Sequence, residues 1–181
     1  MADETSGQER WVREALARYE APLLRYAMSL TGDPDTARDV VQDTFVKMWQ
    51  ADPERIGDRL APWLFTVCRN RALDERRKER RMGRLDQVPA ATMSRLAPDA
   101  TAVAELGAQH REVLEVLRTL PASQQEVVRL KFQGELSYKD ISSITGYSVT
   151  NVGYLLHTAL ATVRTRMSET AAAPVAVERS L

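Results

Sequence analysis

Residues Gly134–Arg166 read GELSYKDISSITGYSVTNVGYLLHTALATVRTR, and this stretch predicts two helices joined by a turn too short for anything but a helix-turn-helix. Ser137 can cap the first helix, and Gly146 can supply the left-handed residue that ends it. Ser148 can cap the second helix, whose apolar residues recur every three or four positions. The residues expected to be buried are Leu136, Ile141 and Ile144 in the first helix and Val149, Val152, Leu156, Ala159 and Val163 in the second.

The opposite face of the second helix is polar and nearly uncharged. It carries Thr150, Asn151, Tyr154 and Thr158 in the place where a recognition helix presents side chains to a DNA major groove. Helix pairs with a glycine turn also occur in repeats and bundles, so plain packing is the structural alternative. The caps on both helices and a basic segment elsewhere in the chain favour DNA contact.

The charges of the chain are balanced overall but segregated along it. The 181 residues carry 25 Lys and Arg against 25 Asp and Glu, which gives a formal net charge of zero. From Arg69 to Arg84, however, eight basic residues stand against three acidic ones. Such a helix can neutralise several phosphates, and the cluster Trp63-Leu64-Phe65 before it suits stacking on unpaired bases. The sequence therefore favours a helix that binds nucleic acid over a solvent-exposed helix that is merely rich in charged residues.

Cysteine and histidine content excludes several classes of site. Cys68 is the single cysteine, so no intramolecular disulfide can form and a reducing compartment is expected. With His110 and His157 it makes no metal-ligand spacing, so we expect neither a metal nor a cofactor. No signal peptide is recognisable, and no apolar run approaches the ~20 residues that span a bilayer. A soluble cytoplasmic protein without a membrane partner or small-molecule substrate is expected.

Nearly every periodic segment is helical, so the fold is predicted to be all-α, with two small helical domains joined by a flexible linker. The periodicity fades where Pro, Ser and Ala become frequent, and this marks the linker. We expect a first domain over residues 8–84, a linker over 85–103, a second domain with the helix-turn-helix over 104–168, and a disordered tail over 169–181.

Prolines in the first domain mark expected helix starts, helix ends and a possible kink. Pro22 lies inside a helical stripe over residues 11–30 and is expected to divide or kink that helix. Asp33 is expected to cap a second helix that Asp52-Pro53 stops, and Pro62 to open a third after a loop over residues 57–61. The buried face of the second helix is predicted to consist of Ala37, Val40, Val41, Phe45 and Met48.

The second helix also carries an acidic-polar strip, which consists of Asp39, Gln42, Asp43 and Val46. These residues fall at i, i+3, i+4 and i+7, opposite the apolar face. The strip suits a basic protein partner, and a plain exposed helix face is an equal alternative. Paired carboxylates can also serve acid–base catalysis, but no His, Lys or metal cluster accompanies these, so we predict that the protein is not an enzyme.

The motifs, taken in order, resemble bacterial RNA polymerase sigma factors of the extracytoplasmic-function (ECF) group. The resemblance covers about Tyr19–Arg81 and Thr119–Arg166 and is carried by YEAPLLRYAMSLTGDPDTARDVVQDTFVKMW, APWLFTVCRNRALDERRKERR and LPASQQEVVRLKFQGELSYKDISSITGYSVTNVGYLLHTALATVR. It implies a promoter-specificity subunit that binds core RNA polymerase, recognises the −35 and −10 elements, melts the −10 region and directs initiation.

The resemblance also implies partners and site residues. Contact with the clamp helices of the largest polymerase subunit would fall to Asp39, Gln42, Asp43 and Val46, with the flap as a second contact. Contact with the −10 element, as duplex and as single strand, would fall to Arg59, Trp63, Phe65, Asn70, Asp74, Arg77 and Lys78. Contact with the −35 duplex would fall to Ser148, Thr150, Asn151, Tyr154, Thr158 and Arg164. An anti-sigma protein is expected to cover the Asp39–Trp49 segment or to wedge between the domains.

The recognition helix departs from the family pattern. Gly153, Tyr154 and Leu155 stand where the family has Lys, Ser and Arg, and Thr158 stands where it has Arg. Gly153 also weakens the helix by about 1 kcal/mol relative to Ala. We therefore expect weak or unusual −35 recognition, or contact of this surface with another protein. Two other functions stay open, namely a free-standing helix-turn-helix regulator and a pure interaction module.

Overall fold

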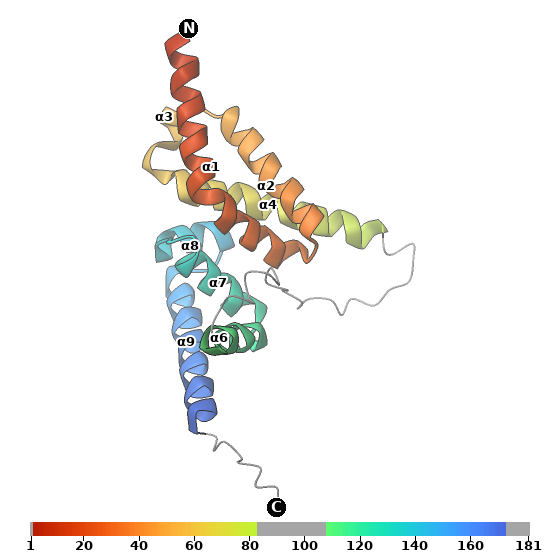
Figure 1. The fold of residues 1–181 in the computed structure, drawn as a ribbon, viewed down its shortest axis with the longest axis vertical. Helices are drawn as coiled ribbons and strands as arrows, with labels where there is room; N and C mark the ends of the chain where they lie inside the picture. Colours follow the sequence, from red (N-terminus) through yellow and green to blue (C-terminus); the bar gives the residue numbers. More distant parts are fainter. Residues whose placement is uncertain (1, 83–107, 173–181) are drawn as a thin grey trace, which may run out of the picture.

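The computed structural model describes residues 2–82 and 108–172, and all regular elements in these ranges are helices (Figure 1). The all-α prediction is thereby confirmed for the described residues. The predicted linker over residues 85–103 lies outside them, as does the expected tail beyond residue 172. Within the described ranges, no helix combines the length and the apolar character needed to cross a bilayer.

The N-terminal domain is a packed group of helices. Its elements are α1 (Ala2–Thr31), α2 (Pro34–Trp49), α3 (Pro53–Ile56), the 3-10 helix η1 (Gly57–Arg59) and α4 (Leu60–Met82). The three long helices α1, α2 and α4 contact one another pairwise. Their shared core contains Leu23, Tyr26, Val40, Met48, Leu64 and Cys68, all fully buried.

Local signals account for the boundary between α1 and α2. Gly32 adopts a positive φ of 77°, which ends α1, and the Asp33 carboxylate accepts a hydrogen bond from the Thr36 N–H at 2.7 Å. The carboxylate satisfies an N–H group that has no partner within the helix. The predicted buried face of α2 is confirmed at all five positions, Ala37, Val40, Val41, Phe45 and Met48.

Of the two outcomes expected at Pro22, division and a kink, the helix is not divided: α1 continues through Pro22, and Figure 1 shows α1 changing direction partway along its length. Leu23, Tyr26 and Ala27 pack into the core directly after it and offset the lost backbone hydrogen bond. One other prediction about the N-terminal domain was wrong. The segment expected as a loop over residues 57–61 is also helical, with η1 followed by the start of α4 at Leu60.

The C-terminal domain contains the helix-turn-helix. Its elements are α6 (Ala108–Thr119), α7 (Ala122–Phe132), α8 (Tyr138–Thr145) and α9 (Val149–Ala172). Ser137 and Asp140 form a reciprocal capping box at the start of α8, and Gly146 ends it at φ 80°. The Ser148 hydroxyl accepts a hydrogen bond from the Asn151 N–H at 3.1 Å at the start of α9. The predicted helix-turn-helix and its caps are confirmed.

The ends of α9 differ from expectation. Val149, expected in the core, is 43% exposed. It is the first residue of α9, and because helical side chains lean toward the N-terminus, its side chain leans past the helix end. At the other end, α9 continues to Ala172, past the boundary at residue 168 that the sequence suggested.

The two domains pack against each other. Helix α8 contacts α4, and Figure 1 shows α8 below the crossing of α1 and α4. Within the described residues the buried side chains of both domains join into one hydrophobic cluster. The C-terminal domain therefore lies directly on the helix expected to bind the −10 element.

Candidate functional site

The acidic-polar strip lies on the outer face of α2. Asp39, Gln42 and Val46 are exposed, and Asp43 is half-buried. The Asp43 carboxylate accepts a 2.6 Å hydrogen bond from Nε of Arg71 on α4. Arg71 also pairs with Glu75, and the hydrogen bond to Asp43 raises the pKa of Arg71. Sequence reasoning missed Arg71, because no spacing within α2 reveals a cation supplied by another helix.

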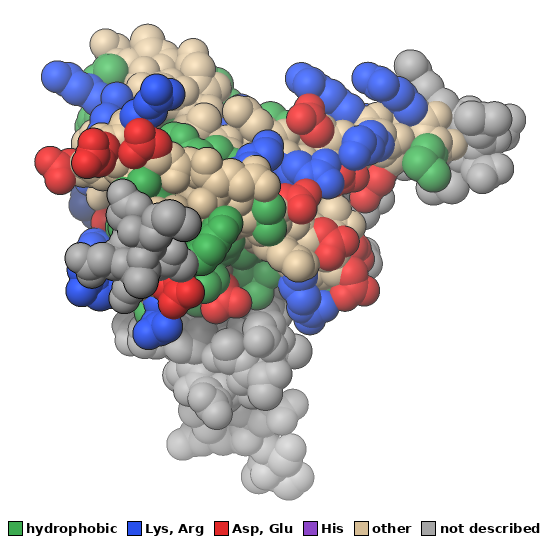
Figure 2. Space-filling model, turned by 90° about the horizontal axis from the view of Figure 1, so that it is seen from above, with side chains coloured by type: hydrophobic (Ala, Val, Ile, Leu, Met, Phe, Trp, Pro, Cys, Tyr) green, Lys and Arg blue, Asp and Glu red, His purple; other side chains and the backbone are tan. Residues whose placement is uncertain are grey.

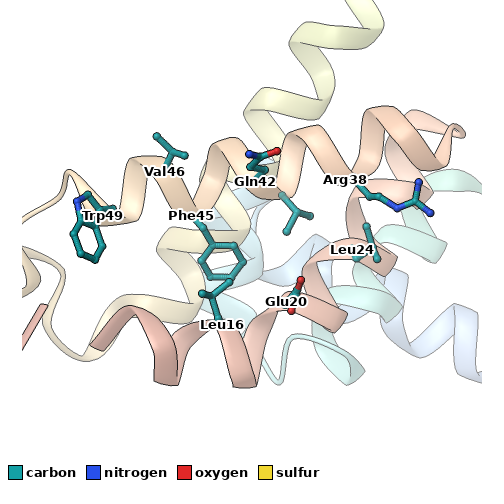
Figure 3. Close-up of a pocket in the computed structure, with 9 residues that line it drawn as sticks. Leu16, Glu20, Leu24, Arg38, Gln42, Phe45, Val46 and Trp49 are labelled. Carbon is teal, nitrogen blue, oxygen red and sulfur yellow. The ribbon is translucent and has the colours of Figure 1, made fainter. Parts of the chain in front are cut away.

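An apolar groove of about 520 Å³ runs beside this strip, between α1 and α2. Figure 3 shows Phe45 of α2 facing Leu16 of α1, with Trp49 at one end of the groove. Its polar residues are Glu20, Arg38 and Gln42. Trp49 is 47% exposed and Val46 is 48% exposed. Such an exposed apolar surface with a polar rim is typical of a protein-binding site.

The basic helix predicted from sequence is the C-terminal half of α4. Figure 2 shows Lys and Arg side chains along the arm that projects from the rest of the molecule. Asn70, Asp74, Arg77 and Lys78 are all exposed on it. Arg77 pairs with Asp74 at 3.3 Å and Lys78 pairs with Glu75 at 3.0 Å. The Arg77–Asp74 pair is exposed on both sides and contributes little, so a phosphate can replace that carboxylate.

The aromatic residues before this helix are less accessible than expected. Trp63 is half-buried and Phe65 is fully buried. The Phe65 ring lies 5.4 Å from the ring of Tyr26, centroid to centroid. Gly134 also approaches this ring closely, because a Cβ atom there would lie 3.1 Å from Cε2 and Cζ of Phe65. The C-terminal domain thus covers the ring that the sequence had assigned to base stacking.

A buried polar cluster joins the domains beside Phe65. Glu126 of α7 accepts hydrogen bonds from the Tyr26 hydroxyl at 2.9 Å and from Nε of Arg69 at 2.8 Å. Burial, together with the Glu126 carboxylate, raises the pKa of Tyr26 well above its usual range. Burial lowers the pKa of the nearby Arg129 guanidinium to about 10, so it remains protonated at neutral pH. The Glu126 carboxylate therefore lies among hydrogen-bond donors and positively charged guanidinium groups.

Two further ion pairs link the domains at the edge of this cluster. Arg59 of η1 lies 3.4 Å from Asp140 of α8, and Arg18 of α1 lies 3.6 Å from Glu135. Together with Arg69 and Glu126, these pairs place each arginine on the N-terminal domain and each carboxylate on the C-terminal domain. Sequence reasoning missed these contacts because the partners lie 57 or more residues apart.

The predicted recognition face of α9 is open to solvent. Ser148, Thr150 and Asn151 are exposed, and Tyr154 is 66% exposed. Thr158 is partly covered, while Arg164 is exposed further along the helix. The ring of Tyr138 from α8 lies beside Gly153: a Cβ atom there would be 3.6 Å from Cε2 of that ring. The two tyrosines, Tyr138 and Tyr154, make this surface aromatic, with little charge.

The described residues offer no grouping of three or more His, Cys, Asp or Glu side chains suited to a metal ion. Cys68 is fully buried, and burial raises the pKa of its thiol to about 12. The thiol behaves as a small apolar group of the core.

Two families match the chain, one over each domain. The Sigma-70 region 2 family matches residues 15–82, and the Sigma-70 region 4 family matches residues 110–168. These ranges fall within α1–α4 and α6–α9, in the order expected from the sequence.

Curated relatives are similar to more than half of the chain. The ECF RNA polymerase sigma factor SigL of Mycobacterium tuberculosis is 41% identical over 121 residues, which cover 58% of this chain and 67% of SigL. The ECF RNA polymerase sigma factor EcfG of Rhodopseudomonas palustris is 34% identical over 130 residues, which cover 71% of this chain and 70% of EcfG.

Solved structures share the fold. The sigma factor RpoE in complex with the anti-sigma factor NepR from Bartonella quintana matches with a TM-score of 0.67 at 24% identity, over 88% of this chain and 98% of that chain. CnrH in complex with the cytosolic domain of CnrY matches with a TM-score of 0.56 at 26% identity, over 93% of this chain and 94% of that chain.

Proposed function

The chain belongs to the ECF RNA polymerase sigma factors and is therefore a promoter-specificity subunit. We propose that separate exposed faces of the chain bind the polymerase, the −10 element and the −35 element. The protein binds core RNA polymerase and promoter DNA and directs transcription initiation. A free-standing helix-turn-helix regulator is not favoured, because such a protein has no need of the Sigma-70 region 2 match over residues 15–82.

The acidic strip of α2 is the proposed docking surface for the clamp helices of the polymerase. Asp39, Gln42 and Val46 are exposed on one helix face, which supports this role. Arg71 holds the Asp43 carboxylate through its 2.6 Å hydrogen bond, so Arg71 acts as a positioning residue. A carboxylate held in one orientation loses less conformational entropy on binding.

The projecting part of α4 is the proposed contact to the −10 element. Asn70, Asp74, Arg77 and Lys78 line it, preceded by Arg59, Trp63 and Phe65. Extracting a base from the duplex costs a few kcal/mol, which stacking and phosphate contacts must offset. The positive charge on this helix supports its assignment to the −10 element. The assignment also requires that the buried ring of Phe65 becomes accessible.

The first turns of α9 are the proposed contact to the −35 element. The exposed face of this helix is the main structural observation that supports the proposed function. Its capped N-terminus leaves Ser148, Thr150, Asn151 and Tyr154 exposed, with Thr158 and Arg164 following along the helix. That is where a recognition helix contacts base edges. Its scarcity of Lys and Arg lowers the number of phosphate contacts and therefore the expected affinity.

Run-off transcription tests the function directly. Core polymerase with this protein is expected to start transcripts at discrete sites of a genomic promoter library, and core alone is not. Asp39→Asn with Gln42→Ala should abolish those transcripts while leaving the helical content unchanged, because both side chains are exposed. Lys139→Ala, on an exposed residue of α8 outside the proposed faces, serves as the control. If the protein yields no discrete transcript, the proposed function is wrong.

An anti-sigma protein is the proposed inhibitor, and the apolar groove between α1 and α2 is its proposed docking site. The groove adjoins the polymerase-binding strip, so an apolar helix seated against Phe45 and Trp49 would block the polymerase. Co-purification from the native host tests this: a bound protein lost on Trp49→Ala, at a groove side chain that is 47% exposed, would support it, and recovery of polymerase subunits alone would contradict it.

The proposed role requires no catalysis by the chain itself, since the polymerase performs the chemistry. It also places the protein with RNA polymerase in the cytoplasm. Fractionation of the native host, with polymerase subunits as markers, tests this location.

A further inference from the structure

We propose that the recognition face of α9 selects thymine, and that it does so through contact of the aromatic rings of Tyr138 and Tyr154 with the C5-methyl groups of A·T pairs in the major groove. The inference rests on the proposed function and deepens it in two ways. It names the chemical group by which the −35 contact selects its sequence, and it adds Tyr138 of α8 to the DNA-binding residues.

The Tyr138 ring lies against the recognition helix at Gly153. A Cβ atom at Gly153 would be 3.6 Å from Cε2 and 4.0 Å from Cδ2 of this ring, so the ring is within van der Waals reach of α9. Tyr138 is nevertheless 40% exposed, and Tyr154, the residue after Gly153, is 66% exposed. Thr150 lies one turn before Gly153, and residues three apart are neighbours on a helix. The ring of Tyr138 therefore widens the face that carries Thr150 and Tyr154.

The side chains of this face match an A·T pair and not a guanine. Residues 147–158 contain no Lys or Arg, the side chains that most often read guanine through two hydrogen bonds. The exposed Asn151 amide can pair with the N6 and N7 atoms of adenine. Apolar groups, here the methyl group of Thr150 and the two tyrosine rings, are the usual contacts of the thymine methyl group. The face thus offers partners for both bases of an A·T pair.

Cations beside the aromatic surface favour DNA over a partner protein as its occupant. Nζ of Lys131 lies 5.7 Å from the centroid of the Tyr138 ring and donates a 3.1 Å hydrogen bond to the carbonyl oxygen of Leu136. This holds the ammonium group next to the ring, with its other N–H groups left for a phosphate. Arg164 is exposed further along α9. An apolar partner protein would have to bury the Lys131 ammonium, which is costly unless it is paired. The major groove instead offers methyl groups between two rows of phosphates.

The test uses holoenzyme reconstituted from the full-length chain and the core RNA polymerase of the native host. A promoter found by run-off transcription is rebuilt as a synthetic template in which deoxyuridine replaces thymidine within the −35 element on both strands. The replacement removes the C5-methyl groups and leaves the hydrogen-bonding groups of each base pair in place. A matched template carries the same replacements in the spacer between the two elements. A third template carries 7-deazaguanine within the −35 element, which removes the N7 acceptor of guanine.

Initiation by the wild-type holoenzyme at limiting concentration is expected to fall about fourfold for each methyl group contacted, the usual effect of burying one such group. The spacer and 7-deazaguanine templates should match the unmodified template. Tyr138→Ala with Tyr154→Ala should initiate less from the unmodified template and should no longer distinguish thymine from uracil. Leu160→Ala, at a 41% exposed apolar residue further along α9, should keep the full difference. If the double variant fails to fold, Tyr154→Ala alone serves, because this side chain is 66% exposed.

Equal initiation from the thymine and uracil templates would overturn the inference, as would a −35 element without thymine or a loss confined to the 7-deazaguanine template. A tyrosine variant that initiates as well as the wild type would assign the aromatic surface to a partner protein instead. In each of these outcomes the holoenzyme still starts transcripts, so the proposed function stands. Absence of any discrete transcript would instead overturn the proposed function.

Discussion

The hydroxyl of Tyr26 donates a 2.9 Å hydrogen bond to the carboxylate of Glu126, a residue 100 positions later in the chain. Tyr26 belongs to α1 and Glu126 to α7, so the bond joins the two domains. Because Glu126 also accepts a hydrogen bond from Arg69 of α4, it holds α7 against both α1 and the helix expected to bind the −10 element.

Replacement of Tyr26 by Phe should destabilise the protein by about 1.5–3 kcal/mol, the usual contribution of a hydrogen bond to a charged group. The ring would still fill its place beside Phe65, so the change isolates the hydroxyl. Urea unfolding followed by circular dichroism measures the effect, with Tyr154→Phe on the exposed face of α9 as the control. A higher free energy of unfolding for Tyr26→Phe would show that the hydrogen bond to Glu126 does not compensate for burial of the hydroxyl.

Gly134→Ala should loosen the contact between the domains. The new Cβ atom would lie 2.9 Å from the Leu130 carbonyl oxygen and 3.1 Å from the Phe65 ring, so the backbone or the ring must move. Overpacking of this kind typically costs about 1–3 kcal/mol. Thermal unfolding gives the loss of stability, and X-ray scattering gives the change in dimensions. Unchanged values of both would contradict the close approach of Gly134 to Phe65.

Gly153→Ala should stabilise the protein by up to about 1 kcal/mol. Gly153 lies inside α9, where Ala is favoured, and the added methyl group would meet the Tyr138 ring at 3.6 Å, an ordinary contact distance. A rise in the thermal midpoint is the expected result. A fall would mean that the Tyr138 ring packs on this glycine more tightly than the distance indicates.

Tyr154→Arg should strengthen binding to duplex DNA and steepen its dependence on salt. Tyr154 is 66% exposed on the recognition face, so the new guanidinium can reach a phosphate. One added phosphate contact should raise the slope of log K against log salt by about one. Anisotropy titrations at several salt concentrations measure the slope, and Tyr154→Gln separates the effect of charge from loss of the ring. An unchanged slope would argue that this face does not meet DNA.

The contribution of the Cys68 thiol to stability should be lost as the pH rises from about 9 to about 12. Burial raises the pKa of the Cys68 thiol from 9.0 to about 12, so the unfolded chain ionises there before the folded chain does. The stabilisation is fully present below pH 9 and is lost through this window. Urea unfolding at several pH values measures it, and Cys68→Ala should remove this part of the slope. Ellman's reagent at pH 8 should modify the thiol only after unfolding.

The helix-turn-helix was predictable because every signal for it is local. Ser137, Gly146 and Ser148 act on neighbouring backbone groups, and a spacing of three or four residues places Val152, Leu156 and Ala159 on one face. The exposed strip of α2 followed from the same periodicity. Pro22 shows the limit of this reasoning, since its local preference allowed either a break or a kink, and the core contacts of the next turn keep α1 continuous.

The sequence by itself determined the two helical domains, their caps, the basic stretch of α4 and the uncharged recognition face, because these depend on residues within a few turns of one another. The tertiary structure alone decided which of the proposed DNA contacts are accessible. Phe65 and Arg69 read as surface residues beside a basic helix, yet Gly134 and Glu126 from the other domain cover them. The physical reason is that burial and ion pairing depend on what lies nearby in space, and here the covering residues lie more than fifty positions away along the chain.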